Sequence, residues 1–180
     1  MGTPREPKPA KFFVALLSSH TDLLPTVEKD LSNILGAVEA RSEVWPWNVS
    51  NFYEKEMGAG LLRRFLSFEP LASPGELARI KLLTQLVEDK HRGDTADHPG
   101  RRVNIDPGYI DAFKVVLAST KNAGQRIYLH SGIYAEATLM YFDGAFHGLA
   151  YTYPDYLWPA TLAFLTSLRS VYVDQLRRLG

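Results

Sequence analysis

The sequence predicts an α+β protein with a ferredoxin-like βαββαβ core, a β-hairpin that extends the antiparallel sheet, and a C-terminal helix. In the first part of the chain, two helical stretches separate strand-like stretches in the order strand, helix, strand, strand, helix, strand. An Asp-Gly dipeptide later in the chain is a strong hairpin signal. A long amphipathic stretch near the end predicts the last helix.

Composition narrows the classes of protein to consider. The 180 residues suit one domain, and 46% of them are hydrophobic, which is ordinary for a globular protein. Lys plus Arg and Asp plus Glu both number 20, so the chain lacks the basic excess of nucleic-acid and anionic-membrane binders. We therefore expect neither as a partner. The chain has no cysteine, which excludes disulfides, thiolate metal ligands and a cysteine nucleophile.

The N-terminal segment, residues 1–10, is polar and rich in proline. We expect it to be a disordered lead-in to a single α+β domain at 11–180. It has no apolar stretch of the kind found in secretory signals, and the longest apolar run, residues 12–17, is too short to span a bilayer. The sequence therefore predicts a soluble, cytoplasmic protein.

The first strand is predicted at 12–17, because a short, continuous apolar run is typical of a strand buried on both faces. A helix follows at 25–35, where apolar residues repeat on one side and Gly36 supplies the stop. Residues 38–47 alternate as an extended segment. The mixed segment at 48–60 is interpreted as a loop with a functional role.

A further strand is predicted at 62–68, followed by a second helix. Ser73-Pro74-Gly75-Glu76 matches a capping box with proline at the first helical position, and apolar spacing continues the helix to about Lys90. The linker at 91–100 contains glycine, aspartate and proline, so we expect it to be mobile.

The stretch from Arg102 to Tyr109 predicts the centre of a site. Val103 and Ile105 alternate with Asn104 and Asp106, so a strand would send the two polar residues to one face. We expect Pro107 to end this strand and Gly108 to form a turn with positive φ. Asn104 and Asp106 would then lie side by side at a strand end. There Asp106 could act in a site, or it could simply cap the turn.

The remainder of the chain predicts more strands and a final helix. Strand-like segments lie at 113–119, 126–129, 135–142 and 146–152, with Asp143-Gly144 as the turn between the last two. The final helix is predicted at about 159–179. We expect the additional strands to extend the first sheet.

Several motifs of this chain occur together in one known family. They are Tyr53-Glu-Lys-Glu-Met-Gly58, the stretch Arg102 to Tyr109, Leu117-Ala-Ser-Thr-Lys121, Arg126-Ile-Tyr-Leu129, Gly132-Ile-Tyr-Ala-Glu136 and Tyr151-Thr-Tyr-Pro-Asp-Tyr156. From Lys11 onward the chain resembles the bacterial family catalogued as domain of unknown function 4416. The resemblance implies a bacterial, soluble, single-domain protein. It assigns no catalytic residue.

Carboxylates are the first group of candidate site residues, since P-loop, GxGxxG, GxSxG and HExxH motifs are absent from the sequence. Asp106 and Glu136 are the candidate catalytic acid and base. With Glu54 and Glu56 as metal ligands, they could form an oxygen-rich site for Mg²⁺ or Mn²⁺. The alternative is that Glu54 and Glu56 pair with Arg63 or Arg64 at the surface.

Basic and amide side chains form the second group. Ser119-Thr120-Lys121 precedes a glycine-containing turn and Arg126, an arrangement that could hold a phosphate or carboxylate. An ordinary polar hairpin turn has the same composition. The predicted ligand-binding residues are Lys121, Arg126, Asn104 and Tyr128, the last because tyrosines often line small-ligand pockets.

These residues predict an enzyme or binding protein for a small anionic metabolite, phosphorylated or nucleotide-like, with or without a divalent metal. The alternative is a non-catalytic protein-interaction module that uses Trp45-Pro46-Trp47 and the last helix. RNA binding is a weaker third possibility, because the strand at Val103 lacks the RNP1 pattern. For the first function we expect at least three of six side chains to line one cleft at an edge of the sheet. The six are Glu54, Glu56, Asp106, Lys121, Arg126 and Glu136.

Overall fold

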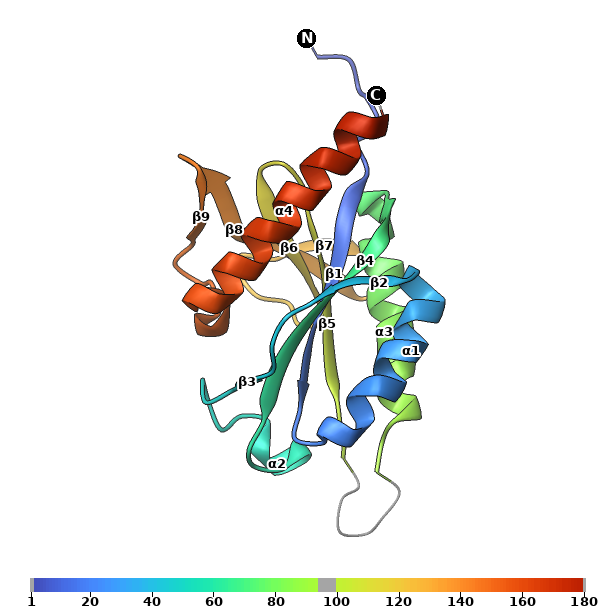
Figure 1. The fold of residues 1–180 in the computed structure, drawn as a ribbon, viewed down its shortest axis with the longest axis vertical. Helices are drawn as coiled ribbons and strands as arrows, with labels where there is room; N and C mark the ends of the chain where they lie inside the picture. The colour runs from blue at the N-terminus through green and yellow to red at the C-terminus, as the bar shows by residue number, and fades with distance from the viewer. Residues whose placement is uncertain (1, 94–99, 180) are drawn as a thin grey trace.

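The computed structural model describes residues 2–93 and 100–179, which form an α+β protein with one nine-stranded antiparallel sheet (Figure 1). The sheet has the order β2-β4-β1-β5-β6-β8-β7, with β3 added to β4 and β9 to β8. The strands are β1 (Ala10–Ser18), β2 (Val38–Arg41), β3 (Trp45–Pro46), β4 (Leu62–Ala72), β5 (Asn104–Ile110), β6 (Lys114–Ser119), β7 (Ile127–His130), β8 (Ile133–Phe142) and β9 (Ala145–Gly148). Within the described ranges the helices are α1 (Leu24–Leu35), α2 (Glu54–Met57), α3 (Leu77–Lys90) and α4 (Pro159–Leu179), with short 3-10 helices η1 (Thr21–Leu23), η2 (Pro74–Glu76) and η3 (Pro154–Tyr156).

The strand β1 lies at the centre of the sheet, and all nine of its residues are buried. Its side chains alternate between the two faces. Phe12 and Val14 pack with residues of α1 and α3, whereas Phe13 and Ala15 belong to the cluster that contains α4. Figure 1 shows α1 and α3 together on one side of the sheet and α4 on the other. The predicted first strand, buried on both faces, is confirmed.

The later elements follow the sequence patterns closely. β8 and β9 pair on either side of Asp143 and Gly144, whose φ values of 49° and 79° suit a two-residue type I′ turn. α4 spans the predicted range. β6, β8 and β7 continue the sheet beyond β5, as expected.

The sheet divides between β5 and β6. β5 pairs with β1 from Asn104 to Ile110, but it pairs with β6 from Gly108 to Ile110 alone. β6 pairs with β8 along its whole length instead. The first residues of β5 and the last residues of β6 therefore diverge. We call this opening the fork.

The prediction that Pro107 ends the strand is wrong, and so is the positive-φ turn at Gly108. β5 continues through both residues, and Gly108 does not have a positive φ. Two positions earlier, the N–H of Ile105 donates to Glu88 and its C=O accepts from Lys81, so on this side of β5 side chains replace a neighbouring strand. Alternation along the strand turns the nitrogen of Pro107 the same way. Its missing N–H therefore removes no ladder hydrogen bond.

Other boundaries also differ from the prediction. The segment 38–47 forms two short strands, the loop 48–60 contains α2, and β4 runs on to Ala72. The Ser73 hydroxyl accepts from the backbone N–H of Gly75, while Glu76 pairs with Arg79, so the reciprocal capping box is not formed. Residues 2–9 carry no helix or strand. The linker predicted at 91–100 lies mainly outside the described residues.

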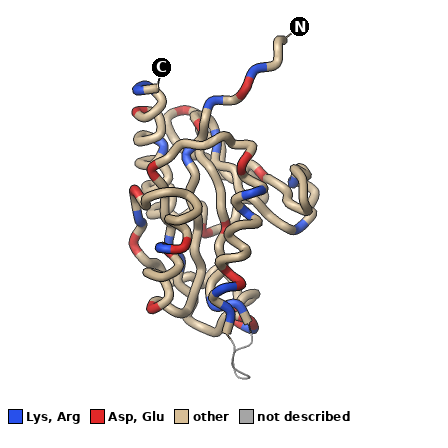
Figure 2. The backbone as a smooth tube through the Cα atoms, turned by 90° about the vertical axis from the view of Figure 1, so that its right-hand side faces the viewer, with Lys and Arg blue, Asp and Glu red and all other residues tan. Residues whose placement is uncertain are grey.

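Charge is spread along the chain. In the view of Figure 2, basic and acidic positions are mixed over the backbone, in agreement with the zero net charge. No helix among residues 2–93 and 100–179 is long and apolar enough to cross a membrane.

Candidate functional site

A cavity of about 390 Å³ opens at the fork. Residues from β5 and β6, from α3, from the segment before α2 and from η3 line it. Its basic side chains are Arg63, Lys81, Arg101, Lys121 and Arg126. Its carboxylates are Glu88, Asp106, Glu136 and Asp155. The volume is within the range of small-molecule sites, roughly 300–1,000 Å³.

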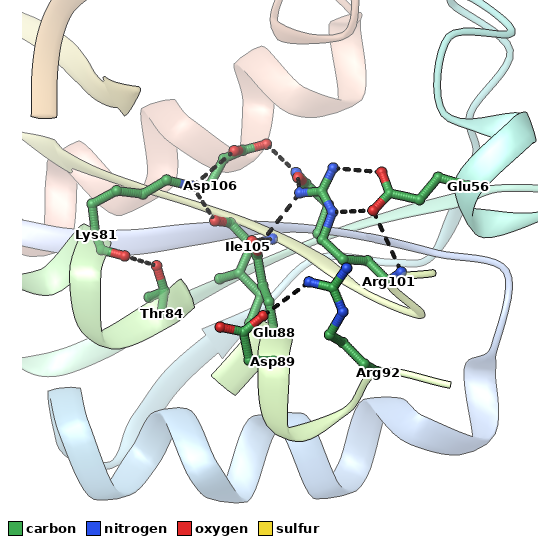
Figure 3. A network of polar contacts seen from close by, with 10 residues as sticks. Glu56, Lys81, Thr84, Glu88, Asp89, Arg92, Arg101, Ile105 and Asp106 are labelled. Carbon is green, nitrogen blue, oxygen red and sulfur yellow. Dashed lines mark hydrogen bonds and ion pairs between the residues drawn. The ribbon is translucent and has the colours of Figure 1, made fainter. Parts of the chain in front are cut away.

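Two charged residues of α3 bind the backbone of β5 inside the fork. The Lys81 Nζ donates to the C=O of Ile105 at 2.8 Å, and a Glu88 carboxylate oxygen accepts from the N–H of the same residue at 2.6 Å (Figure 3). These side chains take the places that a neighbouring strand would occupy. Unpaired backbone groups are costly when buried, so the two contacts stabilise the open edge of β5.

Asp106 projects from this edge into the cavity. Its Oδ2 accepts from Asn104 Nδ2 at 2.6 Å, and Lys81 Nζ lies 3.4 Å from Oδ1. The side chain is 31% exposed, whereas the other three carboxylates of the cavity are almost fully buried. Asp106 is therefore held in place and still accessible to a ligand.

Arg101 holds the side chain of Asn104 in place. It binds both oxygens of Glu56 at 2.8 Å (Figure 3). Through Nη1 it also donates to Asn104 Oδ1 at 2.8 Å. The hydrogen bonds with Arg101 hold the pKa of Glu56 below its usual value, and Glu56 raises the pKa of Arg101. A chain of contacts thus runs from α2 through Arg101 and Asn104 to Asp106.

Arg126 and Glu136 form a buried pair on the β6–β8 side of the cavity. Arg126 Nε and Nη2 each lie 3.2 Å from a different oxygen of Glu136. Arg126 also donates to the Tyr153 hydroxyl at 2.7 Å and to the C=O of Lys121 at 2.9 Å. The pair therefore fixes the backbone that carries Lys121.

A third buried pair forms the floor of the cavity. Arg63 Nη2 lies 2.7 Å from Asp155 Oδ2, which also accepts from Trp47 Nε1 at 3.2 Å. The Arg63 guanidinium is 5.9 Å from the centre of the Trp47 ring. Within the described residues, Arg63 Nε and Nη1 and the Tyr156 hydroxyl have no hydrogen-bond partner. The floor thus contains unused donors.

Lys121 differs from the other cations of the cavity. It pairs with no carboxylate in the described part of the chain, and its Nζ lies 4.6 Å from the centre of the Phe52 ring. Its backbone N–H is held by the Ser119 hydroxyl at 3.1 Å. Within the described residues, the Lys121 ammonium group is therefore available to pair with an anion.

Burial changes the acidity of several groups in the cavity wall. Desolvation raises the pKa of Glu88, although the nearby Lys81 charge acts in the opposite direction. Burial, followed by the Asp106 charge, raises the pKa of Tyr53 to about 12. The tyrosines of the wall are thus hydrogen-bond donors at neutral pH.

Five of the eight predicted site residues line the cavity: Asn104, Asp106, Lys121, Arg126 and Glu136. Of the six side chains expected to share one cleft, four do, which is more than the three predicted. The cleft opens between β5 and β6 inside the sheet, however, and not at an edge of the sheet as expected. Glu54, Glu56 and Tyr128 do not line it. Tyr128 lies on β7 and is exposed.

The predicted metal ligands do not converge. Glu54 and Glu56 lie in a helical turn, which points them in different directions, and Glu56 is engaged by Arg101. Their pairing with Arg63 or Arg64 is also wrong, because Arg63 pairs with Asp155. Among residues 2–93 and 100–179, no group of three His, Cys, Asp or Glu residues could hold a metal ion. Glu136 is buried and uses both oxygens to bind Arg126, so its surroundings favour a structural role.

Sequence reasoning missed Lys81, Glu88, Arg63 and Asp155. A signal was present for the first two, because Lys81 and Glu88 are seven residues apart on the apolar stripe of α3. Charged residues at stripe positions are rarely buried unless they are paired. The pairing of Arg63 with Asp155 spans distant parts of the chain and has no local signal.

The comparisons with known proteins give one match. A family model described as Domain of unknown function (DUF4416) matches residues 8–172. Searches of curated proteins and of solved structures found no match. Because the matched region covers most of the chain, the protein belongs to the Domain of unknown function (DUF4416) family.

Proposed function

We propose that the cavity at the fork binds a small anionic metabolite and that the protein carries or converts it. One observation supports this most directly. Five cations and four carboxylates line the cavity. Each carboxylate lies within 4 Å of a different cation: Asp155 with Arg63, Glu136 with Arg126, Asp106 with Lys81 and Glu88 with Arg101. Lys121 pairs with none of these carboxylates in the part of the chain that the structure describes, so an anionic ligand could pair with it.

Asp106 is the group best placed to react with a bound ligand. It is accessible, and Asn104 and Lys81 fix its orientation. A carboxylate held in this way can take a proton from a ligand or return one. Arg101 and Glu56 act through Asn104 and are positioning residues in this proposal. In this proposal, Mg²⁺ or Mn²⁺ binds only together with the anion, for example as the counterion of a phosphate.

Calorimetric titration with phosphate, nucleotides and small carboxylates tests the proposal. Lys121→Ala should weaken binding by roughly 10- to 150-fold, since hydrogen bonds to charged groups are worth about 1.5–3 kcal/mol. Lys29→Ala is the matched control, because Lys29 is exposed on α1 and does not line the cavity. The proposal fails if no anion binds at millimolar concentration, or if Lys121→Ala binds like the unaltered protein.

A second candidate function, the non-catalytic interaction module, is favoured by β7. All four residues of this edge strand are exposed, and Ile127, Tyr128 and Leu129 are apolar or aromatic. Edge strands are usually protected by charge or proline. The opposite edge, β2, has Glu39 and Arg41, whereas β7 has neither charge nor proline. The contact surface expected from the sequence, Trp45-Pro46-Trp47 with the last helix, is not favoured, because Trp47 is buried.

The partner assigned to β7 is a second copy of the chain. An antiparallel pair centred on Tyr128 sets Ile127 opposite Leu129 of the other copy, so the strand is self-complementary. Light scattering should then report a dimer, and Tyr128→Lys should convert it to a monomer. Leu86→Lys, at an exposed apolar position on α3, should leave the dimer intact. A monomer at all concentrations would rule out this interface.

We also infer that β1, α1, β2, β4, α3 and β5 form a ferredoxin-like core. The inference is supported by their βαββαβ order along the chain, by the strand order β2-β4-β1-β5, and by α1 and α3 covering one face. The cytoplasmic location expected from the sequence stays a prediction.

A further inference from the structure

The cavity has an aromatic wall that the anion-binding proposal does not use. It consists of Phe52, Tyr53 and Trp47, whose rings follow one another at centroid distances of 5.0 and 5.8 Å. Phe52, at the outer end, is 65% exposed. A single exposed phenylalanine needs no explanation, but one that lines a cavity beside a free ammonium is a surface on which a flat group can stack.

A cation stands at each end of this aromatic wall. At the outer end, Lys121 Nζ lies over the Phe52 ring. At the inner end, Arg63 lies over the Trp47 ring and retains Nε and Nη1 without a partner in the described residues. The Arg63 side chain is more than nine-tenths buried. Buried donors without acceptors are costly, so a ligand that offers acceptor atoms would be stabilised there.

The backbone of the outer cation is held in place, by the Ser119 hydroxyl and by Arg126. Because the Lys121 ammonium group lies over the Phe52 ring, an anion paired with it lies near that ring. A flat group attached to the anion can then contact Phe52 and, next to it, Tyr53. The ligand that fits has an anionic group at one end and a flat body with acceptor atoms at the other.

We propose that the ligand is a planar, heteroaromatic anion of the nucleoside monophosphate class, with its ring on the aromatic wall and its phosphate on Lys121. This inference rests on the proposed function and makes it more specific. Ring nitrogens and exocyclic oxygens of a base are acceptors that suit the free donors of Arg63 and Tyr156. The phosphate suits the ammonium of Lys121 and the neighbouring hydroxyls of Ser119 and Thr120.

The test compares ligands that share one part of this chemistry. Purine and pyrimidine nucleoside monophosphates, the matching nucleosides, ribose 5-phosphate and an aromatic carboxylate are titrated calorimetrically into the full chain. The monophosphate should bind roughly 5- to 150-fold more tightly than ribose 5-phosphate, the gain expected from stacking of one base on an aromatic side chain. Phe52→Ala should shrink this difference, because the monophosphate should lose more affinity than ribose 5-phosphate, which has no ring to stack on Phe52. Lys121→Ala should weaken both.

The outcomes separate this inference from the proposed function. Phe142→Ala is the matched control, because Phe142 is 52% exposed and lies outside the cavity lining. Equal affinity for monophosphate and ribose 5-phosphate would overturn the ring inference and leave the anion site standing. Phe52-dependent binding of the aromatic carboxylate, with none of the monophosphate, would overturn the nucleotide assignment. Binding of no anion at all would defeat both proposals.

Discussion

At the scale of single residues, the cavity is built from ion pairs that are buried and also hydrogen-bonded. Arg126 and Glu136 are only 6% and 3% exposed, and each makes further contacts, with Tyr153 and with Gln125. A buried charge is costly when it has no partner. Such pairs therefore fix the geometry of the cavity wall. They add little to the free energy of unfolding compared with apolar side chains at the same positions.

Removing one partner of this pair should be strongly destabilising. For Glu136→Ala we expect a loss of roughly 3–5 kcal/mol in the free energy of unfolding, because the Arg126 charge stays buried without a carboxylate. Urea denaturation measures this loss. Asp174→Ala is the control: it breaks the exposed pair with Arg177, and we expect less than about 1 kcal/mol. Equal effects of the two substitutions would contradict the role assigned to burial.

The raised pKa of Glu88 predicts how the free energy of unfolding changes with pH. Burial raises its pKa in the folded protein. Its contribution to stability is therefore complete at pH values below the unfolded pKa and is lost as the pH rises through the folded pKa. In Glu88→Gln, the side-chain oxygen can still accept from the Ile105 N–H, but this loss with pH is removed. Relative to the unaltered protein, the variant should thus gain stability as the pH rises from below the usual pKa of a glutamate toward neutral pH.

The difference between the two unfolding free energies across this pH range is the quantity to measure. Groups whose pKa is lowered in the folded protein, such as Asp30 and Glu56, contribute to both unfolding free energies, so their contributions cancel in the difference. Parallel stability curves for the two proteins would show that Glu88 does not carry this effect.

At the scale of elements, the fork depends on a close approach of two strands just where they part. A Cβ on Gly108 would lie 2.6 Å from the C=O oxygen of Val116 and 2.8 Å from the Phe13 ring. β5 and β6 can therefore pair at this position only because the residue is glycine. Its φ is not positive, so space and not backbone freedom explains the choice.

Gly108→Ala should force β6 away from β5 and enlarge the fork. We expect a loss of roughly 1–3 kcal/mol in unfolding free energy, the usual cost of overpacking, together with weaker ligand binding in the cavity. Gly124→Ala is the matched control, since a Cβ there would meet no atom within 4 Å and its φ is not in the positive range. Its stability should change by less than about 0.5 kcal/mol. A Gly108→Ala protein as stable as this control would contradict the packing argument.

The element scale also shows why some sequence predictions failed. Pro107 signals the end of a strand in most contexts, but the fork removes the hydrogen bond that it would have interrupted. Glu54 and Glu56 looked like neighbours on an extended segment, yet one helical turn separates their directions. Local pattern cannot decide either case, because the outcome depends on which strand or arginine lies alongside.

At the scale of the whole molecule, the cavity could be predicted in part. Asn104 begins β5, and Lys121 and Arg126 lie in the turn between β6 and β7, where local patterns place polar residues. Asp106 and Glu136 lie inside β5 and β8, where alternation points them into the cavity. The loop at 48–60, interpreted as functional, also contributes lining residues. The residues from α3, β4 and η3 reach the fork only through tertiary packing, and sequence reasoning missed them.

The arrangement of the sheet predicts how the molecule opens. β1 is buried along its whole length and pairs with β4 on one side and β5 on the other, whereas β7 is exposed throughout and pairs with β8 alone. Amide hydrogens of β1 should therefore exchange only through global unfolding, with a free energy equal to that from urea denaturation. Those of β7 should exchange through local opening at a much lower free energy. Hydrogen exchange at two protein concentrations measures both. Slow exchange in β7 that becomes faster on dilution would instead indicate that a second copy covers this edge, and slow exchange at both concentrations would contradict the opening order.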